Sequence, residues 1–296
     1  MDILTQIFNL QTLYATIRMA TPLVIAAIGG IFCERSGIIN IALEGMMLMG
    51  AFIAVLISYF TGSPWLGLIG ATVFGGVFAV IHAFVSIKYH ADQVVSGVAL
   101  NMLAAGGTVF LLNVFFNTSG TSPAVNSLPY WGPFKPTVYF GLLFVLVAHY
   151  VIFHTTFGLR VRSIGEHPHA ADSVGINVEL TRYICVIISG MLAGFAGAHL
   201  SLGVLNIFRE GMTAGRGFIA LAAMIFGKWT PFGALGAGLL FGFFQAVQIR
   251  LQGFAIPSEF VQMIPYIFTV VALAGVIGRA TPPAAIGKPF KKNNRS

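Results

Sequence analysis

The sequence predicts an all-α polytopic transmembrane protein with about eight or nine spans, some of them broken or re-entrant. Hydrophobic residues fill 57% of the 296 positions and charged residues only 8%, against about 25% charged residues in an average soluble domain. The apolar runs are helix-length, unlike the roughly ten-residue alternating segments of a β-barrel. Such a chain cannot cover a water-soluble globule with polar groups, so we expect one transmembrane domain over residues 1–296.

The net charge of +7 reflects membrane topology, and we expect no nucleic-acid binding. Lys and Arg gather at the ends of apolar runs and in the tail 279–296, which is typical of cytoplasmic segments. The two cysteines, Cys33 and Cys185, lie in apolar stretches without the spacing of metal ligands. We therefore expect buried free thiols and no metal site.

The first half of the chain offers four runs that approach the length of about 20 apolar residues needed to span a bilayer. They lie near 12–33, 41–60, 65–87 and 94–116. The stretch 117–136 follows, with four prolines and a Tyr–Trp pair, which indicate a loop at the membrane–water interface. We expect this stretch to be the largest external loop.

The second half offers further long runs near 139–157, 183–203, 232–249 and 260–277. The run 217–227 is too short to span alone, and the sequence leaves open whether it belongs to a crossing or to a re-entrant hairpin. Counting back from a cytoplasmic tail places five basic residues on the cytoplasmic side: Lys88, Arg160, Arg162, Arg182 and Lys228.

Two interrupted segments also resemble each other. Ile41–Met46 (IALEGM) and Ile219–Met224 (IALAAM) agree at four of six positions, and each follows a polar segment that contains Gly and Arg. Paired interruptions in the two halves are typical of inverted repeats that flank a transport path. Because the matching residues are common ones, chance similarity is the alternative.

Polar side chains at membrane depth are the candidates for such a path. Glu44 is a carboxylate in an otherwise uncharged run, a placement that costs about 2.5–3.5 kcal/mol on insertion scales. Asn40 lies one turn earlier on the same helix face. The alternative is structural, with Glu44 in a buried ion pair to Arg18 or Arg35.

Three further polar side chains open the fourth run: Gln93, Ser96 and Asn101. They either line the same path or join neighbouring helices by hydrogen bonds.

The polar loop 158–177 (GLRVRSIGEHPHAADSVGIN) contains the marks of a short helix. Pro168 suits the first helical position and Gly175 the position just past the end. Ala170, Ala171 and Val174 would then share one face, which predicts a surface that docks on a partner outside the membrane. The residues expected at this surface are Glu166, Pro168, Ala170, Ala171, Asp172, Val174 and Gly175.

Three stretches resemble the permease subunits of ABC importers: 37–45 (GIINIALEG), 91–101 (ADQVVSGVALN) and the loop 158–177. The branch is the one that serves branched-chain amino acids, simple sugars and nucleosides, and the resemblance covers essentially the whole chain. ADQVVSG…LN most resembles the shorter permease of nucleoside-type systems. The resemblance implies a multi-pass protein of the bacterial cytoplasmic (inner) membrane, in which 158–177 is the coupling loop.

The partners also follow from the resemblance. It implies an ABC ATPase subunit at the cytoplasmic face, a second permease subunit that is a distinct chain, and an extracytoplasmic substrate-binding protein. The loop is a loose version of the family's Glu-Ala-Ala pattern, because His167-Pro168-His169 separates Glu166 from Ala170.

Other classes of protein fit the sequence less well. No G-x-x-x-x-G-K-[ST] phosphate loop is present, so we expect this chain to bind no cofactor and the partner ATPase to use the ATP. A membrane enzyme would need a catalytic constellation that the sequence lacks, and a channel or ion-coupled carrier would need no docking helix. Few charges accompany the candidate path, which favours a neutral solute; the resemblance favours nucleosides, with simple sugars or branched-chain amino acids as alternatives.

Overall fold

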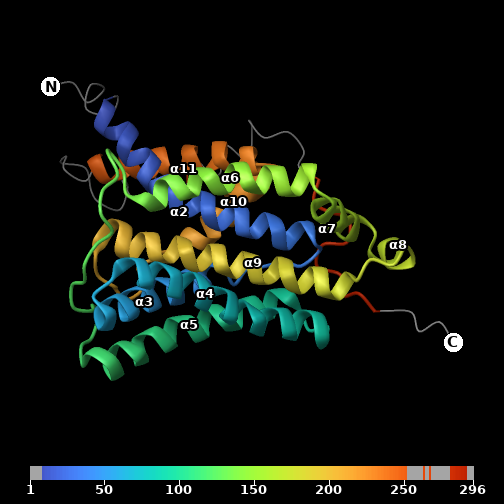
Figure 1. Ribbon diagram of the computed structural model, residues 1–296, viewed down its shortest axis with the longest axis horizontal. Coiled ribbons are helices and arrows are strands. Elements are labelled where there is room, and N and C mark those ends of the chain that lie inside the picture. Colours follow the sequence, from blue (N-terminus) through green and yellow to red (C-terminus); the bar gives the residue numbers. More distant parts are fainter. Residues whose placement is uncertain (1–8, 252–262, 264–266, 268–280, 292–296) are drawn as a thin grey trace.

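The computed structural model describes residues 9–251, 263, 267 and 281–291. Apart from Met263 and Ile267, the expected last span 260–277 lies outside the described residues, as do 279–280 and 292–296 of the expected tail. The described part of the chain is a bundle of helices without a β-strand (Figure 1).

Ten α-helices and two π-helical extensions follow one another in the described residues. They are α2 (Leu10–Arg35), α3 (Leu43–Thr61), α4 (Pro64–Ala83), η1 (Phe84–Lys88), α5 (Gln93–Phe116), α6 (Pro136–His154), α7 (Thr156–Glu166), α8 (Pro168–Ser173), α9 (Val178–Ala198), η2 (His199–Leu205), α10 (Arg216–Phe226) and α11 (Pro231–Leu251).

Seven of these helices are long and apolar enough to cross a membrane, when η1 and η2 are counted with the helices they extend. They are α2, α3, α4, α5, α6, α9 and α11, and each coincides with an expected apolar run. The predicted all-α polytopic fold is therefore confirmed, and the expected external loop falls between α5 and α6.

Local sequence signals set several helix starts. The side chains of Asn9, Asp92 and Asn177 accept hydrogen bonds from backbone N–H groups in the first turns of α2, α5 and α9. Proline is the first residue of α4, α6 and α11, where its missing N–H leaves no helical hydrogen bond unmade. These caps explain why the apolar runs begin as helices where they do.

Small residues allow the central helices to approach closely. Gly75 of α4 lies against Gly190 and Gly194 of α9, and a Cβ atom added at any of the three would collide with the facing backbone. On the other side of the bundle, Gly242 of α11 packs in the same way against α2, and Gly238 lies against the side chain of Val24. Backbone contact of this kind is the usual basis of helix association in membranes, where lipid removes the hydrophobic drive between helices.

The two halves pack in a matching pattern. α9 lies against α3 and α4, while α2 lies against α10 and α11. The two similar hexapeptides lie near the starts of corresponding helices. Ile41–Met46 leads into α3, and Ile219–Met224 lies in α10. In this comparison α2, α3 and α4 correspond to α9, α10 and α11. The first helix of each repeat packs against the last two helices of the other, as inverted repeats predict.

The long segment between α5 and α6 and the short helices α7 and α8 lie at opposite ends of the bundle (Figure 1). The stretch 117–135 lies at one end, and α7 and α8 lie at the other. The described part of the tail joins α7, because the Ala285 N–H donates to the Gly165 carbonyl over 2.8 Å. The expected external loop and the expected cytoplasmic segments are thus separated as the topology requires.

Labelling of single cysteines tests which end is cytoplasmic. Cys33 and Cys185 are buried and free, so both are first replaced by Ala, and Ser163→Cys or Ser127→Cys is then introduced. The bias of Lys and Arg towards cytoplasmic loops predicts that a membrane-impermeant maleimide labels position 127 in whole cells and position 163 only after the membrane is opened. Equal labelling of both positions from outside would reject this topology.

Candidate functional site

The first feature of the site is a break in the membrane-spanning helices. α2 ends at Arg35 and α3 begins at Leu43, and the connecting residues 36–42 are not helical. Asn40 in this segment is 0% exposed. A buried, non-helical backbone must find partners for its N–H and C=O groups, because each unsatisfied group is costly.

Side chains of α4 and α5 supply these partners. Gln93 accepts a hydrogen bond from the Ile39 N–H over 2.7 Å, and His82 Nε2 donates to the Ile39 carbonyl over 2.9 Å. Asn101 donates to the Ile41 carbonyl over 3.1 Å and accepts from the Gly45 N–H over 2.7 Å. The non-helical segment is therefore held by amide and imidazole groups in place of a helical ladder.

The other two predicted polar residues complete this network. Because His82 Nε2 donates, its Nδ1 accepts, and it lies 3.0 Å from the Ser96 hydroxyl. Asn40 donates to the hydroxyl of Ser189 in α9 over 2.9 Å. These are the contacts that the helix-joining alternative expects of Gln93, Ser96 and Asn101, and Asn40 makes a contact of the same kind.

A second break lies opposite the first. η2 ends at Leu205 and α10 begins at Arg216, with a non-helical connection at 206–215. Glu44, in the first turn of α3, accepts a hydrogen bond from the Gly215 N–H over 2.8 Å and another from the Gly217 N–H over 2.6 Å. The helices α3 and α10 thus begin at the same carboxylate.

α10 continues from this point towards the end of the bundle that carries α7. Beyond its last turn, Trp229 donates from its indole N–H to Glu34 over 2.6 Å. Arg35 donates to the Trp229 carbonyl over 2.7 Å. The run 217–227 is therefore part of a crossing that the connection 206–215 completes, and the re-entrant hairpin does not describe it.

The partners of Glu44 differ from those considered in the sequence. The sequence offers Arg18 and Arg35 as ion-pair partners. In the structure Arg35 binds Trp229, and Arg18 lines a pocket at the end of the bundle that carries 117–135, which we call the loop end. The carboxylate instead meets backbone N–H groups at the start of α10, where the helix dipole favours negative charge. This pairing had only a weak sequence signal, the two glycines at 215 and 217.

The second predicted region, the coupling loop, contains one more helix than expected. α7 covers Thr156–Glu166, and the Thr155 hydroxyl accepts from the Gly158 N–H over 3.1 Å at its start. Val161 and Ile164 are buried on one face of α7. That spacing is amphipathic, whereas the sequence pattern predicts only the shorter helix that begins at Pro168.

α8 has the predicted boundaries. It begins at Pro168 and ends at Ser173, and Gly175 follows with a φ of 86°, the left-handed conformation that glycine adopts without strain. Glu166, Ala170 and Gly175 are exposed, while Pro168 and Asp172 are partly buried.

The predicted apolar face of α8 is wrong in one respect. Ala171 is 3% exposed and packs inward in a small cluster with Ile164, Val178 and Phe290. Val174 is 74% exposed and points away from this cluster. The two residues do not share a face because Val174 lies beyond the last helical residue, where the chain leaves the helical path.

Comparisons with known proteins agree with this architecture. A family described as branched-chain amino acid transport system / permease component matches residues 12–273. Guanosine ABC transporter permease protein NupQ of Bacillus subtilis is 44% identical, over 95% of this chain and 96% of NupQ. Nucleoside ABC transporter permease protein NupC of Lactococcus lactis is 40% identical, over 93% of this chain and 94% of NupC.

Two more distant proteins are also similar. Bacillus subtilis has a second relative, guanosine ABC transporter permease protein NupP, which is 26% identical over 84% of this chain and 77% of NupP. A solved structure described as "An inward-facing conformation of a putative metal-chelate type ABC transporter" superposes with a TM-score of 0.53 over 90% of this chain and 85% of that one. With 14% sequence identity, this likeness shows the fold alone.

Replacement of Glu44 tests its role at the junction. Glu44→Ala removes the acceptor of two N–H groups, and each unsatisfied donor costs about 1–3 kcal/mol. We expect Glu44→Ala to lower the melting temperature of the purified protein clearly. Glu44→Gln should melt between Glu44→Ala and the unchanged protein, because it keeps one oxygen acceptor. Glu210→Ala, an exposed carboxylate on the connection 206–215, is the matched control. Equal melting temperatures for Glu44→Ala and Glu210→Ala would contradict the assignment.

Proposed function

The chain belongs to the branched-chain amino acid transport system permease family, and on this premise we propose that it carries nucleosides through the membrane for an ATP-driven importer. The protein is a multi-pass permease subunit of the cytoplasmic membrane and not an enzyme; separate ATPase subunits hydrolyse the ATP. The observation that carries the nucleoside assignment is the 44% identity to a guanosine permease over 95% of this chain.

The chemistry of the junction supports a neutral solute. The side chains of Asn40, Gln93, Ser96 and Asn101 are uncharged and hydrogen-bonded within the protein. The Glu44 carboxylate is engaged by backbone N–H groups. An anionic solute would call for clustered Arg or Lys, which this junction does not offer in the described residues. The lack of free charge is consistent with a nucleoside; a simple sugar is the second candidate and a branched-chain amino acid the third.

We propose that the five polar residues act together at the junction. Asn40, Gln93, Ser96 and Asn101 hold the broken segment in place, and Glu44 keeps the starts of α3 and α10 together. The solute then passes beside this junction, where the starts of α3 and α10 lie at membrane depth. Because a binding protein delivers the solute, weak and transient contacts are sufficient.

The partners follow the same logic. We propose that the ATPase docks on α7 and α8, and that this chain itself binds no nucleotide. The substrate-binding protein meets the opposite end, near 117–135. NupQ and NupP are two different guanosine permease proteins of one organism, which supports a second permease subunit that is a distinct chain.

The exposed side chain of Val174 tests the docking surface. Val174→Glu places a charge at an exposed position just after the end of α8, without touching the packed cluster around Ala171. An unpaired charge buried in an interface costs about 3–5 kcal/mol, so ATP-driven uptake should fall by more than about tenfold. Uptake is measured in proteoliposomes that contain the co-expressed ATPase and second permease.

Two further variants control this experiment. Val174→Thr keeps the shape without the charge and should retain most of the uptake. Ala171→Glu should instead lower the melting temperature, because Ala171 packs against Phe290 within the chain. Normal uptake by Val174→Glu would show that the ATPase docks elsewhere.

Competition between solutes tests the substrate class. In the same proteoliposomes, supplied with the cognate binding protein, unlabelled guanosine should inhibit the uptake of labelled uridine strongly. Ribose and leucine should inhibit little, because neither carries a nucleobase. Inhibition by leucine alone would defeat the nucleoside assignment, and inhibition by ribose equal to that by guanosine would favour a sugar importer.

A further inference from the structure

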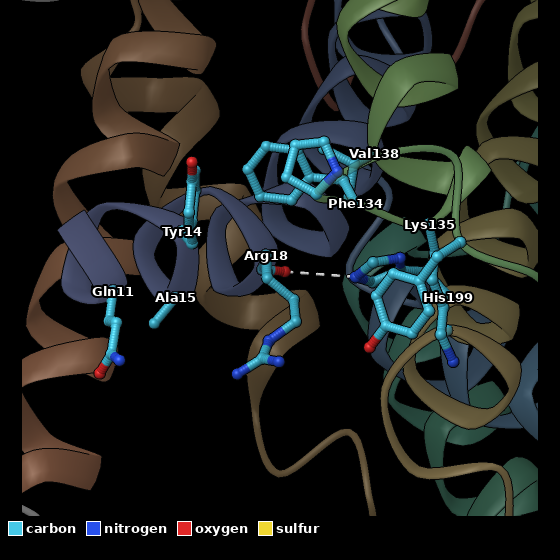
Figure 2. Close-up of a pocket in the computed structure, with 11 residues that line it drawn as sticks. Gln11, Tyr14, Ala15, Arg18, Phe134, Lys135, Val138 and His199 are labelled. Carbon is cyan, nitrogen blue, oxygen red and sulfur yellow. Dashed lines mark hydrogen bonds between the residues drawn. The ribbon is translucent and has the colours of Figure 1, made fainter.

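A pocket lies at the loop end of the bundle, away from the broken helices (Figure 2). Its volume is about 200 Å³, several times the roughly 30 Å³ that one water molecule occupies in the liquid. Figure 2 shows Gln11 and Tyr14 at one side of it and Lys135 and His199 at the other, with Arg18 between them. The walls come from α2, from the segment before α6 and the start of α6 itself, and from η2.

Two cationic side chains line this pocket. Lys135 is 9% exposed, and its ammonium lies 3.4 Å from the Leu202 carbonyl and 5.4 Å from the centre of the Tyr130 ring. Burial, together with the nearby Arg18 charge, lowers the pKa of Lys135. No carboxylate lines this pocket in the part of the chain that the structure describes. The site is therefore electropositive and suits an anion.

A hydrogen-bonded histidine fixes the inner side of the pocket. His199 Nε2 donates to the Arg18 carbonyl over 3.2 Å, and its Nδ1 accepts from the Thr137 hydroxyl over 2.7 Å. Both bonds are satisfied within the protein, so His199 positions the turn of α2 that carries Arg18. The backbone that carries the Arg18 side chain is thus held in place by hydrogen bonds.

A smaller apolar groove, of about 20 Å³, borders the pocket. It runs between α2, α6 and α11 and shares Val138 with the pocket. Its lining is almost wholly aliphatic: Ile17, Ala20, Thr21, Val24, Val138, Gly141, Leu142, Leu235 and Leu239. On α2 the groove reaches Val24, about 9 Å deeper than Arg18 at 1.5 Å per residue.

Aromatic side chains mark the depth of the pocket in the membrane. Tyr130 and Trp131 are exposed, and the Tyr139 hydroxyl donates to the Trp131 carbonyl over 2.6 Å. Tyr14 and Phe134 meet edge to face, with ring centres 5.4 Å apart. Exposed Tyr and Trp gather at the level of lipid headgroups. The pocket is therefore at headgroup depth, and the groove is at acyl-chain depth.

We propose that this pocket and groove bind one anionic phospholipid of the external leaflet, with its phosphate between Arg18 and Lys135 and an acyl chain in the groove. A free inorganic anion could contact Arg18 and Lys135 but would leave the apolar groove empty. A nucleoside is uncharged and has no long apolar chain, so the site is distinct from the transport path. The bound lipid would bridge α2, α6 and α11.

A photoactivatable phosphatidylglycerol tests the proposal on the whole importer complex in nanodiscs. We expect crosslinks on α2, α6 and α11, displaced by unlabelled phosphatidylglycerol but not by phosphatidylcholine or inorganic phosphate. The double variant Arg18→Gln, Lys135→Gln should reduce crosslinking by about tenfold, because it removes two charge-assisted contacts. Arg209→Gln, which removes a positive charge outside the pocket, is the matched control and should crosslink normally.

A second double variant guards against simple misfolding. Arg18→Lys, Lys135→Arg keeps both charges and should retain the crosslinks. Unchanged crosslinking by the Gln variants would overturn the proposal, as would equal competition by phosphatidylcholine. Displacement by inorganic phosphate would assign a free-anion site instead. A further outcome is that the Gln double variant loses docking of the substrate-binding protein while lipid crosslinking stays normal. That result would assign Arg18 and Lys135 to the binding protein and would reject the lipid site.

Discussion

The pairing of the Glu44 carboxylate with two backbone N–H groups is the interaction on which the centre of this protein depends. A carboxylate at membrane depth is costly unless donors surround it, and the start of a helix with free N–H groups is costly for the same reason. Glu44, Gly215 and Gly217 satisfy both demands together. A side chain at Gly217 would collide with the Glu44 backbone, so the contact also requires glycine there.

The other break is stabilised in a different way. The backbone of residues 36–45 relies on side chains from α4 and α5, chiefly His82, Gln93 and Asn101. The backbone that precedes α10 relies on Glu44, which belongs to α3. The two repeats therefore share a packing plan but differ in their polar chemistry, which explains why their similarity in sequence is confined to a few apolar positions.

Sequence alone predicted the features that depend on neighbouring residues. Apolar run lengths gave the spans, and Pro168 with Gly175 gave the ends of α8. It did not predict contacts with residues far along the chain: the N–H partners of Glu44 are more than 170 positions away, and backbone groups leave little trace in sequence. The inward orientation of Ala171 depends likewise on Phe290 in the tail, which no local pattern could indicate.

The contacts at the α7 end link the proposed docking surface to the broken segment. The described tail donates from Ala285 to the Gly165 carbonyl of α7 over 2.8 Å, and from Gly287 to the Gly37 carbonyl over 3.0 Å. Gly165 also lies directly against the end of α2 at Arg35. A displacement of α7 must therefore either break these bonds or move the start of the broken segment with it. Glu44 lies in the first turn of α3, which follows this segment directly, and it binds the start of α10. The same displacement would therefore move the starts of both helices.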